Sequence, residues 1–141
     1  MREDNRDEQG FTLLEMLVVL ALLALVAGFA APRVIGLFAK AKGDVALVQV
    51  EMLAGALDHY RLDVGTYPSD EQGLAALVAK PGDAPRWNGP YLQGSEVPMD
   101  PWGRPYRYRV VDEPGRGFEI VSLGADGAEG GDGDDADIRS K

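Results

Sequence analysis

Carboxylates and glycines are interleaved near the end of the chain. The segment 123–138 carries six acidic residues and five glycines, namely Asp126, Glu129, Asp132, Asp134, Asp135 and Asp137 with Gly124, Gly127, Gly130, Gly131 and Gly133. Calcium takes about six to eight oxygen ligands from carboxylates and carbonyls, and glycines let carbonyls turn inward. These residue types therefore predict a calcium site. The repelling charges are also typical of a disordered, solvated tail, and the ligand order of an EF-hand is missing, so both interpretations stay open at this point.

A second carboxylate stands where it costs free energy. Glu15 lies in an apolar run from Phe11 to Ala31, which as a helix would cross a hydrocarbon core about 30 Å thick. A carboxylate costs about 2.5–3.5 kcal/mol near the bilayer centre, and less near its edge, unless something neutralises it. Cleavage after Gly10 would place a new α-amino group on Phe11, on the same helix face as Glu15. That amine would neutralise Glu15 within one chain or between neighbouring chains. The alternative is an uncleaved signal anchor whose Glu15 reaches the membrane interface.

The N-terminal motif resembles the type IV pilin superfamily. A short polar leader ends at Gly10, the sequence Phe11-Thr12-Leu13-Leu14-Glu15 follows, and a long apolar helix leads to Pro32. The resemblance implies that a prepilin peptidase cuts after Gly10, that Phe11 becomes the N-methylated start, and that Glu15 serves subunit assembly. The leader departs from the family pattern because its acidic residues outnumber its arginines, which weakens the positive-inside preference.

The helical pattern continues beyond Pro32. Apolar residues recur at spacings of three and four from Val34 to Tyr60, which predicts an amphipathic helix over 33–62 that continues the transmembrane and assembly helix over 11–32. We expect its distal part to pack against the chain's own C-terminal half. The proximal part, 34–41, is expected to be buried against other copies.

The remaining residues, 63–141, predict one small globular head. A short helical pattern lies within 70–80, and two strands are predicted over 106–111 and 117–123, joined as a hairpin. Tyr106, Tyr108 and Val110 would form an apolar face that sits on the helix. The predicted fold is α+β and pilin-like: a long N-terminal helix packed against a small antiparallel sheet, after a leader over 1–10 and with an acidic calcium-binding loop over 123–138.

One turn within the head is predicted to be rigid. In Asp100-Pro101-Trp102-Gly103 the proline fixes one φ angle and the glycine permits a positive one. We expect this turn to bury Trp102 in the core.

The order of motifs along the head narrows the resemblance. The chain is similar to the major pseudopilins of type II secretion systems in five stretches: Gly65-Thr66-Tyr67-Pro68, Gly73-Leu74, Gly89-Pro90-Tyr91-Leu92, Val97 to Tyr106, and Ser122-Leu123-Gly124-Ala125-Asp126-Gly127. The resemblance implies calcium ligation by the Leu123 carbonyl and by Asp126, Asp135 and Asp137, with Asp134 in reserve. A bound ion would stabilise a head that has no cysteine for disulfides.

The resemblance also implies a function. The chain would be the major structural subunit of a secretion pseudopilus, anchored by one helix in a bacterial inner membrane with its head in the periplasm. Copies would polymerise into a helical fibre that helps drive folded proteins through the outer membrane, together with the prepilin peptidase, minor pseudopilins and an inner-membrane assembly platform. The alternatives are a type IV pilus subunit and a monomeric, membrane-tethered calcium-binding module.

Composition argues against other classes of function. The formal net charge is −9, whereas nucleic-acid binding needs clustered lysines and arginines. His59 is the only histidine, and no cysteine or nucleophile motif is present, so we expect no enzymatic activity.

Overall fold

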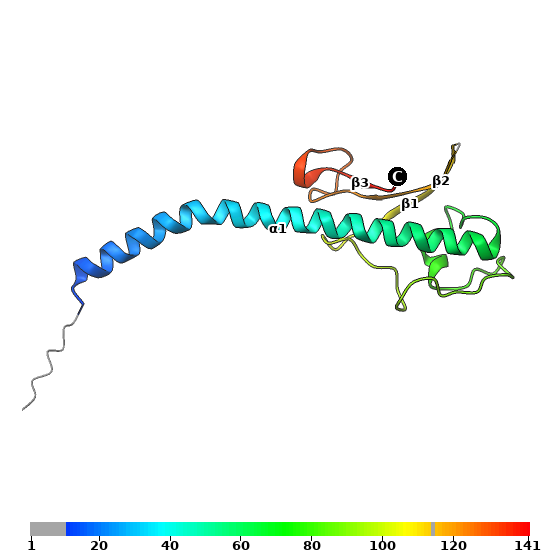
Figure 1. The fold of residues 1–141 in the computed structure, drawn as a ribbon, viewed down its shortest axis with the longest axis horizontal. Coiled ribbons are helices and arrows are strands. Elements are labelled where there is room, and N and C mark those ends of the chain that lie inside the picture. Colours follow the sequence, from blue (N-terminus) through cyan, green and yellow to red (C-terminus); the bar gives the residue numbers. More distant parts are fainter. Residues whose placement is uncertain (1–10, 114) are drawn as a thin grey trace, which may run out of the picture. The chain divides into compact units, whose positions relative to one another are not determined.

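One long helix dominates the fold. In the computed structural model, which describes residues 11–113 and 115–141, helix α1 runs from Leu13 to Val64 and continues through Pro32 (Figure 1). Thr12 caps its start, because Thr12 Oγ1 accepts a hydrogen bond from the Glu15 amide at 3.1 Å. The two predicted helices are therefore segments of one helix.

The N-terminal part of α1 has an apolar surface. Every residue from Phe11 to Leu37 is exposed, and among the described residues α1 is the one helix long and apolar enough to cross a membrane. A continuous apolar surface of this kind calls for cover by lipid or by protein.

The core of the head, which falls within residues 38–141, is built on the distal part of α1. The helix buries a stripe of residues at spacings of three and four, namely Ala46, Val50, Leu53, Ala56, Leu57 and Tyr60. The short 3-10 helix η1 (Gly73–Leu77) adds Leu74 and Leu77, and the sheet adds Ile120. The predicted packing of the distal stripe against the chain's own C-terminal half is confirmed.

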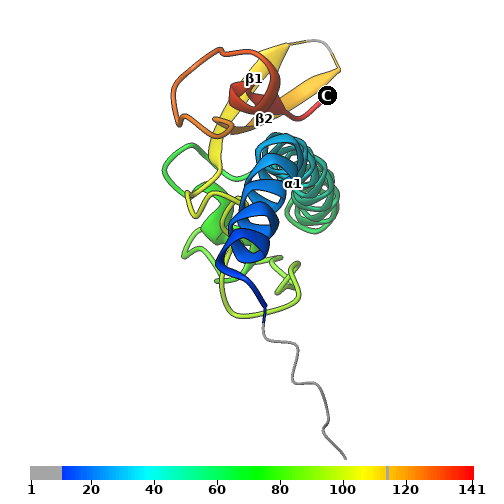
Figure 2. The ribbon, with the colours of Figure 1, turned by 90° about the vertical axis from the view of Figure 1, so that its left-hand side faces the viewer.

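A three-stranded antiparallel sheet, β1 (Arg107–Glu113), β2 (Arg116–Ser122) and β3 (Ile138–Arg139), runs along one side of the distal part of α1 (Figures 1 and 2). The first two strands confirm the predicted hairpin. Strand β3 was not predicted, because two residues are too few to show an alternating pattern.

The predicted apolar face of β1 is only partly correct. Tyr106 is buried and its hydroxyl donates a hydrogen bond to Gln49 Oε1 of α1 at 2.5 Å, and Tyr108 donates to the Pro68 carbonyl at 2.8 Å. Val110, in contrast, is 44% exposed. It stands where the register of the β1–β2 pair shifts, so the alternation that holds earlier in the strand is interrupted there.

The turn at Asp100 forms as predicted, but its buried residue is different. Gly103 has a φ of +82° and its amide donates to the Asp100 carbonyl at 2.9 Å. Trp102 is only partly buried, whereas Asp100 is 4% exposed. The Asp100 carboxylate accepts hydrogen bonds from the amides of Trp102 and Arg104 at 3.0 and 2.8 Å. The turn therefore buries the Asp100 carboxylate rather than the Trp102 indole.

Candidate functional site

The N-terminal motif is described from Phe11 onward, and Gly10 lies outside the described residues. Phe11 is 73% exposed. Glu15 lies in the first turn of α1 and is also exposed. Cleavage after Gly10, methylation of Phe11 and neutralisation of Glu15 remain predictions.

The acidic segment 123–138 is a folded loop. The Ala125 amide donates to the Asp134 carbonyl at 2.9 Å, and the Asp137 amide donates to the Gly130 carbonyl at 3.2 Å. The short 3-10 helix η2 (Gly133–Asp135) lies between these contacts. This hydrogen bonding favours an ordered loop over a disordered tail.

Arg104 fastens the loop to the turn at Asp100. Its guanidinium donates to the carbonyls of Gly124 and Ala125. Ser122, at the end of β2, donates its hydroxyl to Asp100 Oδ2 at 2.7 Å. The buried Asp100 carboxylate therefore joins the turn to the strand from which the acidic loop departs.

The predicted calcium ligands do not converge. The Leu123 carbonyl accepts the Gly127 amide at 3.1 Å, and Asp126 is exposed with its Oδ1 accepting the Ala128 amide at 2.9 Å. Asp134 and Asp135 are exposed. Within residues 11–113 and 115–141, no three acidic, histidine or cysteine side chains are gathered as a metal site.

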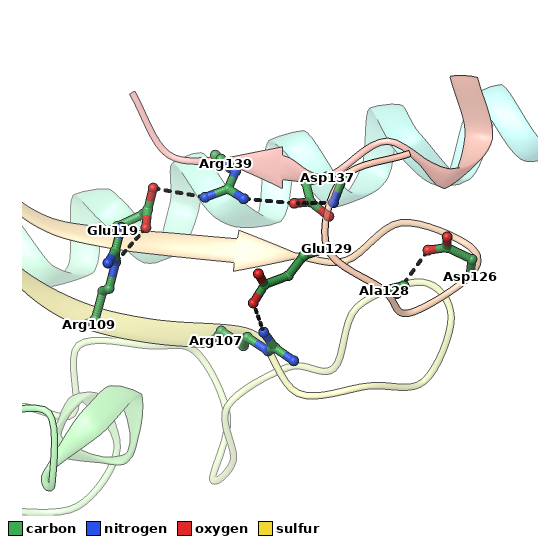
Figure 3. Close-up of polar contacts among 9 residues, drawn as sticks. Arg107, Arg109, Glu119, Asp126, Ala128, Glu129, Asp137 and Arg139 are labelled. Atoms are coloured by element: carbon green, nitrogen blue, oxygen red, sulfur yellow. Dashed lines mark hydrogen bonds and ion pairs between the residues drawn. The ribbon is translucent and has the colours of Figure 1, made fainter. Parts of the chain in front are cut away.

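Asp137 differs from the other predicted ligands because its side chain is only 7% exposed. Its Oδ2 accepts hydrogen bonds from the Gly130 amide at 3.1 Å and from the Arg139 guanidinium at 2.8 Å. Its Oδ1 is buried and has no hydrogen-bond partner in the described part of the chain. Figure 3 shows Asp137 facing Arg139, while Asp126 lies at the far side of the loop.

The oxygen donors of the loop therefore suit calcium, but the predicted ligands are not arranged around a common point. Carboxylate and carbonyl oxygens are the donors that this hard cation prefers, and Asp137 Oδ1 is an oxygen that lacks a partner among the described residues. The other Asp137 oxygen is held by an arginine. In the ligand set that the resemblance implies, Asp126 would have to turn toward Asp137 to share an ion with it.

A chain of ion pairs crosses one face of the sheet (Figure 3). Arg109 and Glu119 are direct cross-strand partners, and their side chains meet at 2.6 Å. Arg139 on β3 contacts Glu119 at 3.2 Å and Asp137 at 2.8 Å. The two carboxylates are almost fully buried, whereas Arg109 and Arg139 are 65% and 45% exposed.

The pKa values of the two buried carboxyls follow from these contacts. Burial raises the pKa of Glu119, but hydrogen bonds from Arg109 and Arg139 outweigh it and the pKa is lowered. For Asp137, the hydrogen bond from the Gly130 amide lowers the pKa most, and Arg139 lowers it further against the opposing effect of burial. Both groups are therefore held as carboxylates.

Sequence reasoning missed Arg139, Glu119 and Arg104 as parts of this site. Arg107 and Arg109 alternate with tyrosines along β1, and their side chains are exposed. The partners of these arginines depend on how β2 and β3 are aligned with β1. A strand prediction for Ile138–Arg139 would have been the signal that placed Arg139 beside Glu119.

Two family models match the chain. The model described as type II secretion system (T2SS), protein G matches residues 33–141. The model described as prokaryotic N-terminal methylation motif matches residues 5–31. Together they cover both the apolar helix and the head.

Similar proteins carry the same description over nearly their whole length. The type II secretion system core protein G of Pseudomonas aeruginosa is 45% identical over 138 residues, which cover 95% of each chain. That of Vibrio cholerae is 42% identical over 136 residues, 94% of this chain and 91% of the relative. The crystal structure of the major pseudopilin from the type 2 secretion system of enterohaemorrhagic Escherichia coli superimposes with a TM-score of 0.59 at 34% identity, over 74% of this chain and 90% of that one. The chain therefore belongs to the type II secretion system protein G family, the major pseudopilins, and is a secretion pseudopilus subunit.

Proposed function

We propose that this pseudopilus subunit polymerises into a periplasmic fibre while its N-terminal helix supplies both the membrane anchor and the fibre core. The observation that carries the proposal is the apolar surface from Phe11 to Leu37, in which every residue is exposed, with one carboxylate, Glu15, in the first turn of α1. Lipid would cover this surface before assembly, and the helices of other copies would cover it afterwards.

Processing would switch the helix from anchor to fibre core. Cleavage after Gly10 by a prepilin peptidase would free the Phe11 amine, which becomes methylated but keeps its positive charge. Because an unpaired carboxylate is costly in an apolar surrounding, Glu15 would favour a position beside a Phe11 amine of its own or a neighbouring copy. An inner-membrane assembly platform would add subunits, minor pseudopilins would take part in the assembly, and the growing fibre would help drive folded proteins through the outer membrane.

The first test is the intact mass of the protein recovered from membranes of cells with and without the prepilin peptidase. We expect a chain that starts at Phe11 and carries one added methyl group only when the peptidase is present. A chain that starts at Met1 in both strains would contradict the fibre proposal and favour a membrane-tethered calcium-binding module.

We also propose that calcium binds and stabilises the loop over 123–138, with the Leu123 carbonyl, Asp126, Asp135 and Asp137 as ligands and Asp134 in reserve. Support comes from the donor chemistry and from the partnerless, buried Oδ1 of Asp137 in the described chain. A cation bound only by the folded head would stabilise it by mass action.

The calcium proposal predicts a specific loss in the Asp126→Ala variant. The full-length chain in detergent micelles should melt at a higher temperature in millimolar calcium than in chelator, and Asp126→Ala should abolish most of that difference. Thermal unfolding followed by tryptophan fluorescence measures both, because Trp102 lines a groove with Gly133 and Asp134.

Asp132→Ala is the matched control, since it removes an exposed carboxylate of the same loop that is outside the proposed ligand set. Its calcium response should stay close to that of the wild type. Identical melting of the wild-type chain with calcium and with chelator would refute calcium binding.

A further inference from the structure

Arg139 stands between two buried carboxylates at the point where the acidic loop ends. It lies in β3, and its guanidinium contacts Glu119 on β2 at 3.2 Å and Asp137 at 2.8 Å. The side chains of Glu119 and Asp137 are only 6% and 7% exposed. Buried carboxylates of this kind destabilise a fold strongly when their counter-charge is removed.

The position of Arg139 fixes both ends of the loop to one strand. Strand β2 runs directly into the loop through Ser122 and Leu123, and β3 returns beside it with Val121 opposite Arg139. The next residue, Ser140, donates its amide to the Ile120 carbonyl at 2.9 Å and accepts the Ile120 amide on its hydroxyl at 3.0 Å. The Arg139 guanidinium, which bridges Asp137 and Glu119, therefore holds the end of the loop against β2.

A positive charge at this place would also oppose a metal. Asp137 Oδ2 is already bonded to Arg139, and only Oδ1 is buried without a partner among the described residues. A divalent ion on Oδ1 would lie within a few ångströms of the guanidinium, and like charges at such distances repel strongly where water is excluded.

We propose that Arg139 acts as an internal counter-ion that holds the acidic loop closed without metal and that it weakens the affinity of the loop for calcium. The affinity part rests on the calcium binding proposed above, whereas the closure part stands without it. The ligand class is a divalent, oxygen-seeking cation, and Arg139 determines how strongly this chain depends on it.

The test compares Arg139→Gln with the wild type as full-length chains in detergent micelles. Thermal unfolding is measured in chelator and in calcium, and calcium affinity is measured by calorimetry. In chelator, Arg139→Gln should melt several degrees lower. It should also bind calcium roughly tenfold more tightly and regain most of the lost stability when calcium is present.

Arg107→Gln is the matched control, because Arg107 lies on the same sheet face but pairs with an exposed carboxylate, Glu129. Its charge acts on Asp137 without a hydrogen bond, so Arg107→Gln should change the melting temperature in chelator and the calcium affinity far less than Arg139→Gln does. If Arg139→Gln fails to fold, Arg139→Lys replaces it: a lysine keeps the charge but does not bridge two carboxylates, so melting temperature and affinity should both be intermediate.

The outcomes separate the two proposals. Unchanged melting of Arg139→Gln in chelator would overturn the counter-ion role, whatever calcium does. An affinity equal to that of the wild type would overturn the competition. A lower melting temperature for Arg139→Gln without calcium binding by either chain would support closure by Arg139 and would refute the calcium proposal.

Discussion

At the scale of single residues, Glu119 is the carboxylate on which the sheet's ion pairs converge. It is 6% exposed and receives hydrogen bonds from Arg109 at 2.6 Å and Arg139 at 3.2 Å. A hydrogen bond to a charged group contributes about 1.5–3 kcal/mol, and more is lost when a buried partner is left behind. The arginines remain partly hydrated, which reduces the loss on their side.

We expect Glu119→Gln to lower the free energy of unfolding by about 1–2 kcal/mol, because the amide keeps the shape but loses the charge that both arginines contact. For a head of this size that is a fall of roughly 5–10 °C in the melting temperature, measured by thermal unfolding at neutral pH. Glu129→Gln is the control, since Glu129 is 73% exposed and its pair with Arg107 should contribute almost nothing. Equal effects of the two substitutions would contradict this assignment.

The same carboxylate gives the stability a pH dependence of known sign. The pKa of Glu119 is lower in the folded chain than the ordinary value of 4.5. The contribution of Glu119 is therefore fully present above pH 4.5 and is lost as the pH falls through the lower, folded pKa. The difference in melting temperature between the wild type and Glu119→Gln should accordingly shrink below that pH, whereas a constant difference would mean that the charge is not the cause.

These contacts between single residues could not be predicted from the sequence. Glu119 and Arg139 are 20 positions apart, and their contact depends on a strand of two residues whose pairing no local pattern reveals. The Asp100 turn shows the same limit. Its proline and glycine predicted the turn itself, but Trp102 appeared to be the buried residue because an indole is apolar. The hydrogen bonds that bury Asp100 come from its own turn and from Ser122.

At the scale of elements, local patterns were sufficient where the pattern is long. The spacing of three and four predicted α1 and its buried distal stripe, and alternation predicted β1 and β2. The loop over 123–138 is different, because its order depends on close backbone packing. An added Cβ at Gly124, whose φ is +59°, would lie 2.5 Å from the Asp135 carbonyl oxygen.

Gly124→Ala should therefore destabilise the head by about 2–4 kcal/mol, the sum of the left-handed backbone and an overpacked contact. Gly133→Ala is the matched control: its φ is +62°, but a Cβ there would meet nothing within 4 Å. It should cost only about 1 kcal/mol. Thermal unfolding of the full-length chain in chelator measures the stability of both variants. Equal losses of stability would show that the packing of the loop against Gly124 does not contribute to the stability of the head.

At the scale of the whole molecule, the fold and the family were predictable because they rest on the longest patterns in the chain. The apolar run, the glutamate within it and the order of the motifs in the head can all be recognised directly in the sequence. In the proposed fibre, many copies together would cover the exposed helix surface. A single chain shows only that Phe11 to Leu37 is uncovered, and we expect Glu15 to be the residue that distinguishes a fibre subunit from a tether.

Glu15→Leu is expected to abolish fibre assembly while leaving membrane insertion intact. Insertion should even become easier, because the substitution removes a carboxylate from the apolar run; its cost near the end of the helix is below the value of about 2.5–3.5 kcal/mol for a carboxylate at the bilayer centre. Assembly would lose the partner of the Phe11 amine, and fibres isolated from the periplasmic fraction and seen by electron microscopy should be absent. Glu51→Leu, an exposed glutamate of α1 within the head, is the control and should still assemble. Normal fibres and normal secretion with Glu15→Leu would mean that the carboxylate serves neither recruitment nor packing, and the uncovered helix would then be an anchor alone.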